Sequence, residues 1–143
     1  MDDVKVLAVG CFDPLHYGHL LHLQKARSLG THLMVGLTAD EVIGKGPGRP
    51  AFPWREREAM LYALRCVDGV MLHRDIETTL RLYSPNLYVK GDEYEDVLPE
   101  QALCERLGIE VVFLRTRPVY SSSKLLSGAL LDERIQAARA GGQ

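Results

Sequence analysis

Two histidines near the N-terminus have the type and spacing of a phosphate-binding site. The stretch GCFDPLHYGH, residues 10–19, follows an apolar run and carries His16 and His19 three positions apart, with Gly18 between them. Residues three apart share one face of a helix. A helix that begins here attracts anions through its free N–H groups and its dipole, and two imidazoles add further donors. The pattern indicates a polyphosphate site rather than zinc, because no HExxH motif is present and His22 lies about 60° further round the helix.

Three later segments carry charges and hydroxyls suited to the same chemistry. The Gly- and Pro-rich loop 44–53 offers Lys45 and Arg49, and Arg57 follows it in a helical pattern. YVKGDEY, residues 88–94, ends an apolar run, and SSSK, residues 121–124, begins another helical pattern. Phosphoryl-type transfer needs positive charge where the leaving pyrophosphate develops its own. A Walker A loop is excluded, because no GxxxxGK[ST] spacing occurs.

Each of these residues also has a purely structural explanation. The histidines would be one buried core residue and one solvated loop residue. Lys45 would be a solvated cation, and Arg57 an exposed helix charge paired with Glu56 or Glu58. Asp92 would be a turn residue, and the serines would cap a helix.

Composition excludes several classes of protein. The 143 residues are 46% hydrophobic and 25% charged with a net charge of −2, which is typical of one globular domain and offers no surface for nucleic acid or membrane. No apolar stretch reaches the length of a spanning helix, and the acidic start is not that of a signal peptide. The three cysteines, Cys11, Cys66 and Cys104, are odd in number and widely spaced. We therefore expect a reducing, cytoplasmic compartment and no cysteine-based zinc site.

Short apolar runs alternate with helical patterns along the chain. We expect strands over 4–9, 32–38, 69–72, 87–90 and 109–114. We expect helices over 18–29, 54–66, 75–83, 98–107 and 122–139, with a short helical turn at 40–43. Strands of continuous apolar character between helices predict an α/β fold, a Rossmann-like, doubly wound, five-stranded parallel sheet with helices on both faces. Ligands bind such sheets beyond the carboxyl ends of the strands, which is where the segments above lie. We expect the domain over 1–136 and a linker-like tail over 137–143, which leads to a further domain if the chain is part of a longer protein.

GCFDPLHYGH is similar to the GxFDxxHxGH signature of the cytidylyltransferase-like nucleotidyltransferases, and the resemblance covers about residues 4–130. It implies that His16 and His19 contact a nucleoside triphosphate and stabilise the transition state at the α-phosphorus. KGPGRPAFPWRER, residues 45–57, resembles the KGxxRPxxPxxxR stretch of the ADP-heptose adenylyltransferases. RCVDGV, residues 65–70, resembles the family's RYVDEV stretch, which implies a homodimer.

The last resembling segment departs from the family pattern. RTRPVYSSSK, residues 115–124, is similar to RTxGISTTK but has one extra residue, and Arg117–Tyr120 replace a Gly-containing turn. The departure leaves open whether Arg115 or Arg117 contacts the ligand. Because Pro118 fixes its own φ and extends the residue before it, we expect an altered, smaller acceptor pocket.

The resemblance implies the following site residues. Catalytic roles fall on His16, His19, Lys45 and Arg57. Nucleotide contacts fall on Gly10, Cys11, Phe12, Asp13, Gly18, Lys90, Gly91, Asp92, Arg115, Ser121, Ser122 and Ser123. Acceptor contacts fall on Arg65, Arg117 and Tyr120. No protein ligand to a metal is assigned, although Asp92 either binds the base or helps to hold Mg²⁺, which accompanies the nucleotide.

The expected activity is that of a Mg²⁺-dependent nucleotidyltransferase with pyrophosphate as the second product. Between nucleotides we favour CTP over ATP, since the RT…SSSK end leans towards cytidylyltransferases while the KGxxRP loop leans towards adenylyltransferases. The expected acceptors are glycerol 3-phosphate and 2-hydroxyethylphosphonate, the latter the substrate of a cytidylyltransferase domain of fosfomycin biosynthesis. The alternatives are an ATP-dependent adenylyltransferase of the ADP-heptose type and a nucleotide-binding module without catalysis.

Overall fold

A computed structural model describes residues 2–116 and 122–141 of the chain, the side chains of 123, 124 and 129–131 excepted. Its centre is a sheet of five parallel strands in the order β3-β2-β1-β4-β5. The strands are β1 (Lys5–Gly10), β2 (His32–Thr38), β3 (Gly69–His73), β4 (Leu87–Gly91) and β5 (Glu110–Leu114). This confirms the predicted fold class.

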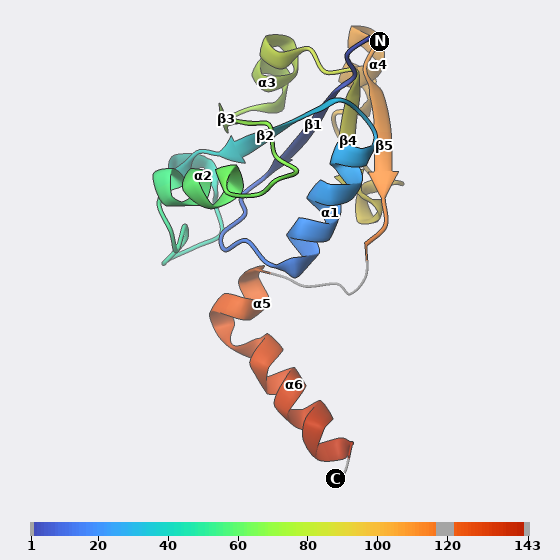
Figure 1. Cartoon of the computed structure of the whole chain (residues 1–143). Coiled ribbons are helices and arrows are strands. Elements are labelled where there is room, and N and C mark those ends of the chain that lie inside the picture. Colours follow the sequence, from blue (N-terminus) through green and yellow to red (C-terminus); the bar gives the residue numbers. More distant parts are fainter. Residues whose placement is uncertain (1, 117–121, 142–143) are drawn as a thin grey trace.

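Four helices cover the two faces of the sheet in pairs (Figure 1). They are α1 (Tyr17–Ser28) and α2 (Trp54–Tyr62) on one face, and α3 (Ile76–Tyr83) and α4 (Gln101–Leu107) on the other. Right-handed crossovers require this division, because the chain moves from β1 through β2 to β3 in one direction and returns through β4 to β5 in the other. Single 3₁₀ turns, η1 (Asp40–Val42) and η2 (Asp92–Tyr94), follow β2 and β4.

The core consists of two apolar layers, one on each side of the sheet. Val6 and Ala8 of β1 pack with Leu23 of α1 on one side, while Leu7 packs with Leu80 of α3 on the other. Successive strand residues point to opposite faces, and in a fully covered parallel sheet both faces are apolar. The strands therefore read as continuous apolar runs, and their carboxyl ends are the part of the sheet left open for a ligand.

The C-terminal region differs from the single closing helix that the sequence predicts. It forms α5 (Ser122–Ser127) and α6 (Ala129–Ala140), separated by Gly128, whose φ of 80° lies in the left-handed region and interrupts the helix. Together they extend away from the sheet (Figure 1). The predicted tail from 137 is helical up to Ala140, so no change of structure marks the expected boundary at 136.

Smaller differences concern helix ends. Helix α2 ends at Tyr62 rather than at residue 66, and α4 begins at Gln101 rather than at 98.

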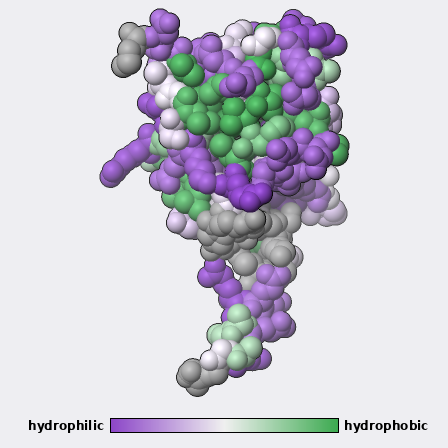
Figure 2. Space-filling model, turned by 90° about the vertical axis from the view of Figure 1, so that its right-hand side faces the viewer, coloured by the Kyte–Doolittle hydropathy of each residue, from purple (hydrophilic) through white to green (hydrophobic). Residues whose placement is uncertain are grey.

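Strand β5 lies at the edge of the sheet, and Figure 2 shows apolar side chains gathered on that side of the molecule. In the described part of the chain, every helix is too short or too polar to cross a bilayer.

Candidate active site

A cavity of about 570 Å³ opens where β1 and β4 end and α1 begins. One wall, here called the α1 wall, is lined by residues of β1, its following loop and the start of α1, namely Val9, Gly10, Phe12, His16, Gly18, His19 and His22. The opposite wall, the β4 wall, comprises residues 89–94 of β4 and η2. The cavity thus lies at the point where the sheet's connections change direction, which is the usual ligand position in this fold.

His16 and His19 hold each other in place at the first turn of α1. His16 precedes the helix, and its Nδ1 accepts from the backbone N–H of His19 at 3.3 Å; the Nδ1 of His19 accepts from the backbone N–H of His16 at 3.2 Å. This is a capping box built from two imidazoles. The rings stack with centroids 3.7 Å apart and planes 15° from parallel. The spacing of three is therefore required by the helix start itself.

The reciprocal bonds also decide where the ring protons lie. Because both Nδ1 atoms accept, each neutral ring carries its proton on Nε2. Burial is the main cause that lowers the pKa of His19 to about 3, and His16, His22 and Lys45 lower it further. Burial also lowers the pKa of His16. At neutral pH the pair consists of neutral N–H donors at a helix N-terminus, a combination that suits phosphate oxygens.

Gly10 lets the chain fold back beside the histidines. A Cβ atom at Gly10 would lie 2.9 Å from the ring of Phe12. Phe12 itself has a φ of 47°, is 6% exposed and places its ring edge-on to His19 with centroids 4.8 Å apart. Both residues line the cavity, and their contact with a nucleotide stays a prediction.

Asp13 faces away from the cavity and anchors the loop 44–53. Its carboxylate is fully buried and accepts from the Arg49 guanidinium at 3.0 Å and from the N–H groups of Ala51 and Phe52 at 2.7 and 2.9 Å. Burial by itself raises the pKa of Asp13, but these donors outweigh it, and the pKa is lower than usual. The predicted nucleotide contact is therefore corrected: its acceptor atoms bind the protein's own loop.

Arg57 also holds the loop 44–53 in place, and its position does not support the catalytic role predicted for it. The guanidinium is 2% exposed and donates to the backbone carbonyls of Phe52, Cys11 and Thr38, each at 2.9 Å. It also forms an ion pair with Asp40. Neither Arg57 nor Cys11 lines the cavity, because the arginine is fully engaged in joining the ends of β1 and β2 to α2.

Lys45 remains a candidate for the phosphates. It is exposed on the loop that Asp13 and Arg57 hold in place, and its charge reaches His19 strongly enough to lower that residue's pKa. The loop can thus carry a cation to the start of α1 while its own base stays fixed.

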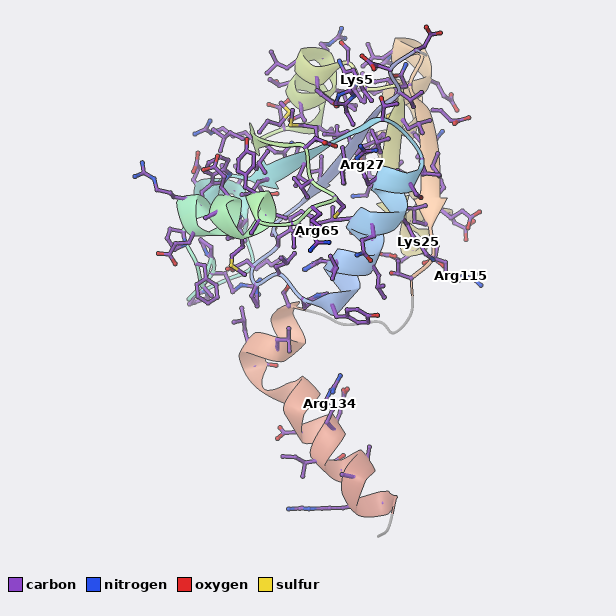
Figure 3. The ribbon with its side chains drawn as sticks, viewed as in Figure 1. Lys5, Lys25, Arg27, Arg65, Arg115 and Arg134 are labelled. Carbon is purple, nitrogen blue, oxygen red and sulfur yellow. The ribbon has the colours of Figure 1, made fainter. Side chains whose placement is uncertain are left out.

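The β4 wall carries the remaining predicted residues that the structure brings to the cavity. Lys90, Gly91 and Asp92 all line it. Asp92 forms an ion pair with Arg115 at 2.9 Å, and the Arg115 side chain projects outward from the end of β5 (Figure 3). Arg115 is thus joined to the site through Asp92 and does not itself line the cavity.

The C-terminal residues are only partly covered by the description. Arg117, Tyr120 and Ser121 lie outside the described residues, as does the side chain of Ser123. The hydroxyl of Ser122 is nearly buried and donates to the carbonyl of Pro14 at 2.8 Å, so it ties α5 to the loop before the histidines.

Arg65 is exposed on the segment after α2 and does not line the cavity (Figure 3). An acceptor contact within one chain is therefore not supported for Arg65. Its predicted place at a dimer interface stays a prediction.

Four residues of the cavity with polar side chains are absent from the predicted site. His22 on the second turn of α1 lines it, together with Glu93, Tyr94 and Thr116. In the sequence pattern His22 raises only the question of a zinc ligand, and the other three follow closely after predicted site residues. The available signal was their place directly beyond the ends of β4 and β5, where parallel strands present ligand contacts.

Comparison with known proteins agrees with this geometry. The model of the family described as "Cytidylyltransferase-like" matches residues 7–127. The chain belongs to this family. It is 42% identical over 130 residues to the "Bifunctional protein HldE" of Streptomyces coelicolor, covering 87% of this chain and 28% of the relative. It is 41% identical over 109 residues to the "D-beta-D-heptose 1-phosphate adenylyltransferase" of Bordetella bronchiseptica, covering 72% of this chain and 67% of that protein.

The solved structures add the fold. The lipopolysaccharide core biosynthesis protein of Thermoplasma volcanium superposes with a TM-score of 0.69 at 28% identity, over 83% of this chain and all of that one. The pantothenate synthetase of Thermus thermophilus, at 16% identity and a TM-score of 0.64 over 87% of this chain and 61% of that one, shares the fold alone. The chain spans just over a quarter of the length of the HldE relative. These relatives favour the adenylyltransferase alternative over CTP transfer, and none of them supports the phosphonate acceptor.

Proposed function

We propose that this chain transfers AMP from ATP to the phosphate group of a sugar 1-phosphate and releases pyrophosphate. The observation that carries the proposal is the reciprocal His16–His19 pair at the start of α1, in a chain 41% identical to a heptose 1-phosphate adenylyltransferase. Two neutral N–H donors at a helix N-terminus suit the triphosphate, and the likeness to that relative supports the choice of ATP and of a sugar phosphate.

The transfer needs no general base. An acceptor phosphate oxygen, already ionised at neutral pH, attacks the α-phosphorus in line; the new P–O bond forms as the bond from the α-phosphorus to the bridging oxygen of pyrophosphate breaks. The Nε2–H groups of His16 and His19 donate to the oxygens that gain charge, and Lys45 neutralises the departing pyrophosphate. Catalysis then consists of positioning and charge stabilisation.

Magnesium would enter with the nucleotide. This ion is usually held by substrate phosphates together with one or two carboxylates. Asp92 lines the cavity with a partly exposed side chain, so it would supply one such carboxylate.

A pyrophosphate-release screen tests the proposal. Four nucleoside triphosphates are combined with four acceptors: heptose 1-phosphate, one other sugar 1-phosphate, glycerol 3-phosphate and 2-hydroxyethylphosphonate. We expect turnover with ATP and a sugar 1-phosphate. Turnover with CTP and either of the last two acceptors would restore the cytidylyltransferase interpretation, and nucleotide binding without any turnover would indicate a non-catalytic module.

The homodimer is a further part of the proposal. It rests on the resemblance of residues 65–70 to the family's interface stretch. Sedimentation at micromolar concentration is expected to give twice the 16.0 kDa chain mass. An active monomer would remove the interface role of Arg65.

A further inference from the structure

Lys90 has surroundings unusual for a lysine. Its ammonium lies 4.3 Å from the ring centroid of Tyr94 and 5.9 Å from that of Tyr88. Within residues 2–116 and 122–141, no carboxylate forms an ion pair with it. The carboxylate of Glu100, whose charge reaches Lys90, instead accepts from the Tyr88 hydroxyl at 2.7 Å. Lys90 is thus a cation on the cavity wall that rings, rather than an opposite charge, hold in place.

Such a cation gains strongly from an anionic ligand. Burial lowers the pKa of Lys90, and the charges of Glu100 and Glu93 oppose that effect. Removal of an ammonium from water is costly unless an opposite charge compensates it, and a charge-assisted bond is about twice as strong as a neutral one. The half-buried ammonium of Lys90 would therefore gain from a ligand that brings further negative charge.

Lys45 and Lys90 influence different parts of the site. The charge of Lys45 lowers the pKa of His19, whereas the charge of Lys90 lowers the pKa of His22 and that of His73 at the end of β3. The proposed reaction joins two phosphate-bearing molecules. The triphosphate fits the start of α1 with Lys45, so a separate cation on the β4 wall remains for the second phosphate.

Glu93 sets the chemistry next to this cation. A Cβ atom at Gly91 would lie 2.2 Å from Oε2 of Glu93, so the carboxylate rests against the bare α-carbon of Gly91. From there it is close enough to His22 to raise that residue's pKa against the effect of burial. A carboxylate repels a second phosphate but accepts from hydroxyl groups. The partly exposed ring of Tyr94 adds an apolar surface beside it.

We propose that Lys90 binds the phosphate of the acceptor, in a subsite where Glu93 accepts from the acceptor's hydroxyl groups and Tyr94 packs against its carbon skeleton. The subsite suits a polyhydroxylated phosphomonoester. This inference rests on the proposed transfer to a sugar phosphate, and it assigns to the β4 wall the acceptor rather than the nucleotide that the sequence predicts for Lys90.

The test compares Lys90→Met with Lys5→Met, because Lys5 also lies over a tyrosine ring, 4.4 Å from the centroid of Tyr83, but at the amino end of the sheet. Two quantities are measured: the Kd of ATP by calorimetry and the KM of the best sugar 1-phosphate in the pyrophosphate assay. For Lys90→Met we expect the acceptor KM to rise about 10- to 100-fold, as for loss of a bond to a charged group, with the Kd of ATP changed less than about twofold. Lys5→Met is expected to change neither, and Lys90→Arg to restore most of the acceptor affinity.

One further measurement separates failure of the proposed function from failure of this inference. If the wild type turns over no acceptor, the proposed function fails, and binding of inorganic phosphate to protein saturated with a non-hydrolysable ATP analogue tests the subsite by itself. Loss of that binding in Lys90→Met supports the inference. A weaker Kd for ATP with an unchanged acceptor KM or phosphate Kd would assign Lys90 to the nucleotide and overturn it.

A second variant tests the role of Glu93. We expect Glu93→Gln to lower the preference for a sugar 1-phosphate over unsubstituted ethyl phosphate about tenfold, since its carboxylate accepts from the acceptor's hydroxyl groups. An unchanged ratio would remove Glu93 from the subsite.

Discussion

The two walls of the cavity use their polar residues in opposite ways. Behind the α1 wall, Asp13 and Arg57 are buried and bound to the protein itself, and on the wall the Nδ1 atoms of both histidines cap their own helix. On the β4 wall, Lys90 has tyrosine rings beside it, and the Asp92–Arg115 pair is largely exposed. The first wall is a fixed frame, and the second has charge left for ligands. A sequence signature therefore mixes residues that build a site with residues that face its substrates.

The largest effect we expect is the loss of stability when Arg57, which joins the ends of β1 and β2 to α2, is replaced. Arg57→Met leaves three part-buried backbone carbonyls without this buried donor, and it should lower the free energy of unfolding by about 3–5 kcal/mol. Urea denaturation measures it. Arg81→Ala, which removes an exposed pair with Glu77, is the control and should cost less than about 0.5 kcal/mol. Equal effects of the two would show that the frame is not rigid.

The next effect separates the two tasks of His16. Asparagine caps helices well but has no Nε2–H, so His16→Asn should keep the stability while kcat falls about 100-fold. His16→Ala should lose the same activity and, in addition, about 1 kcal/mol of stability because the cap is gone. Full activity in the folded His16→Asn protein would return this histidine to a structural role alone.

A pH dependence of stability follows from the buried histidines. The pKa of His19 is about 3 in the folded chain against an ordinary 6.5, so between these values the unfolded chain binds more protons. Stability should therefore rise with pH through this window, fall as the pH drops below about 6.5, and change by at most about 1.4 kcal/mol per pH unit for one histidine. Urea midpoints at pH 7, 6 and 5 measure the slope. His19→Asn should flatten this slope. An unchanged slope would show that another titrating group causes the pH dependence of stability.

The smallest effect belongs to the exposed pair of the β4 wall. Arg115→Ala should alter the free energy of unfolding by less than about 1 kcal/mol, because the Arg115 side chain is 72% exposed. The same variant removes the positive charge of Arg115 from Asp92, so the Mg²⁺ concentration for half-maximal activity is the sensitive readout, and we expect it to fall. A stability loss comparable to that of Arg57→Met would show that the two walls are equally rigid.

The sequence by itself determined the fold class and the place of the site. Apolar strand runs that alternate with helical patterns predict a covered parallel sheet, and GCFDPLHYGH at the end of the first strand predicts where the site lies. The spacing of His16 and His19 is a local property of a helix start, so it could be interpreted without tertiary contacts.

Only the tertiary structure decided which polar residues face the cavity. Asp13 lies 36 to 39 positions from the loop groups that bind it, and Arg57 lies 46 positions from Cys11, so neither clamp is visible in a local pattern. The roles we propose for Lys90 and Glu93 also depend on their surroundings in the fold. The ammonium of Lys90 lies over the ring of Tyr94, and the carboxylate of Glu93 rests against the α-carbon of Gly91. Burial and partners are set by chain segments that meet only on folding, and they decide whether a charge serves the frame or a ligand.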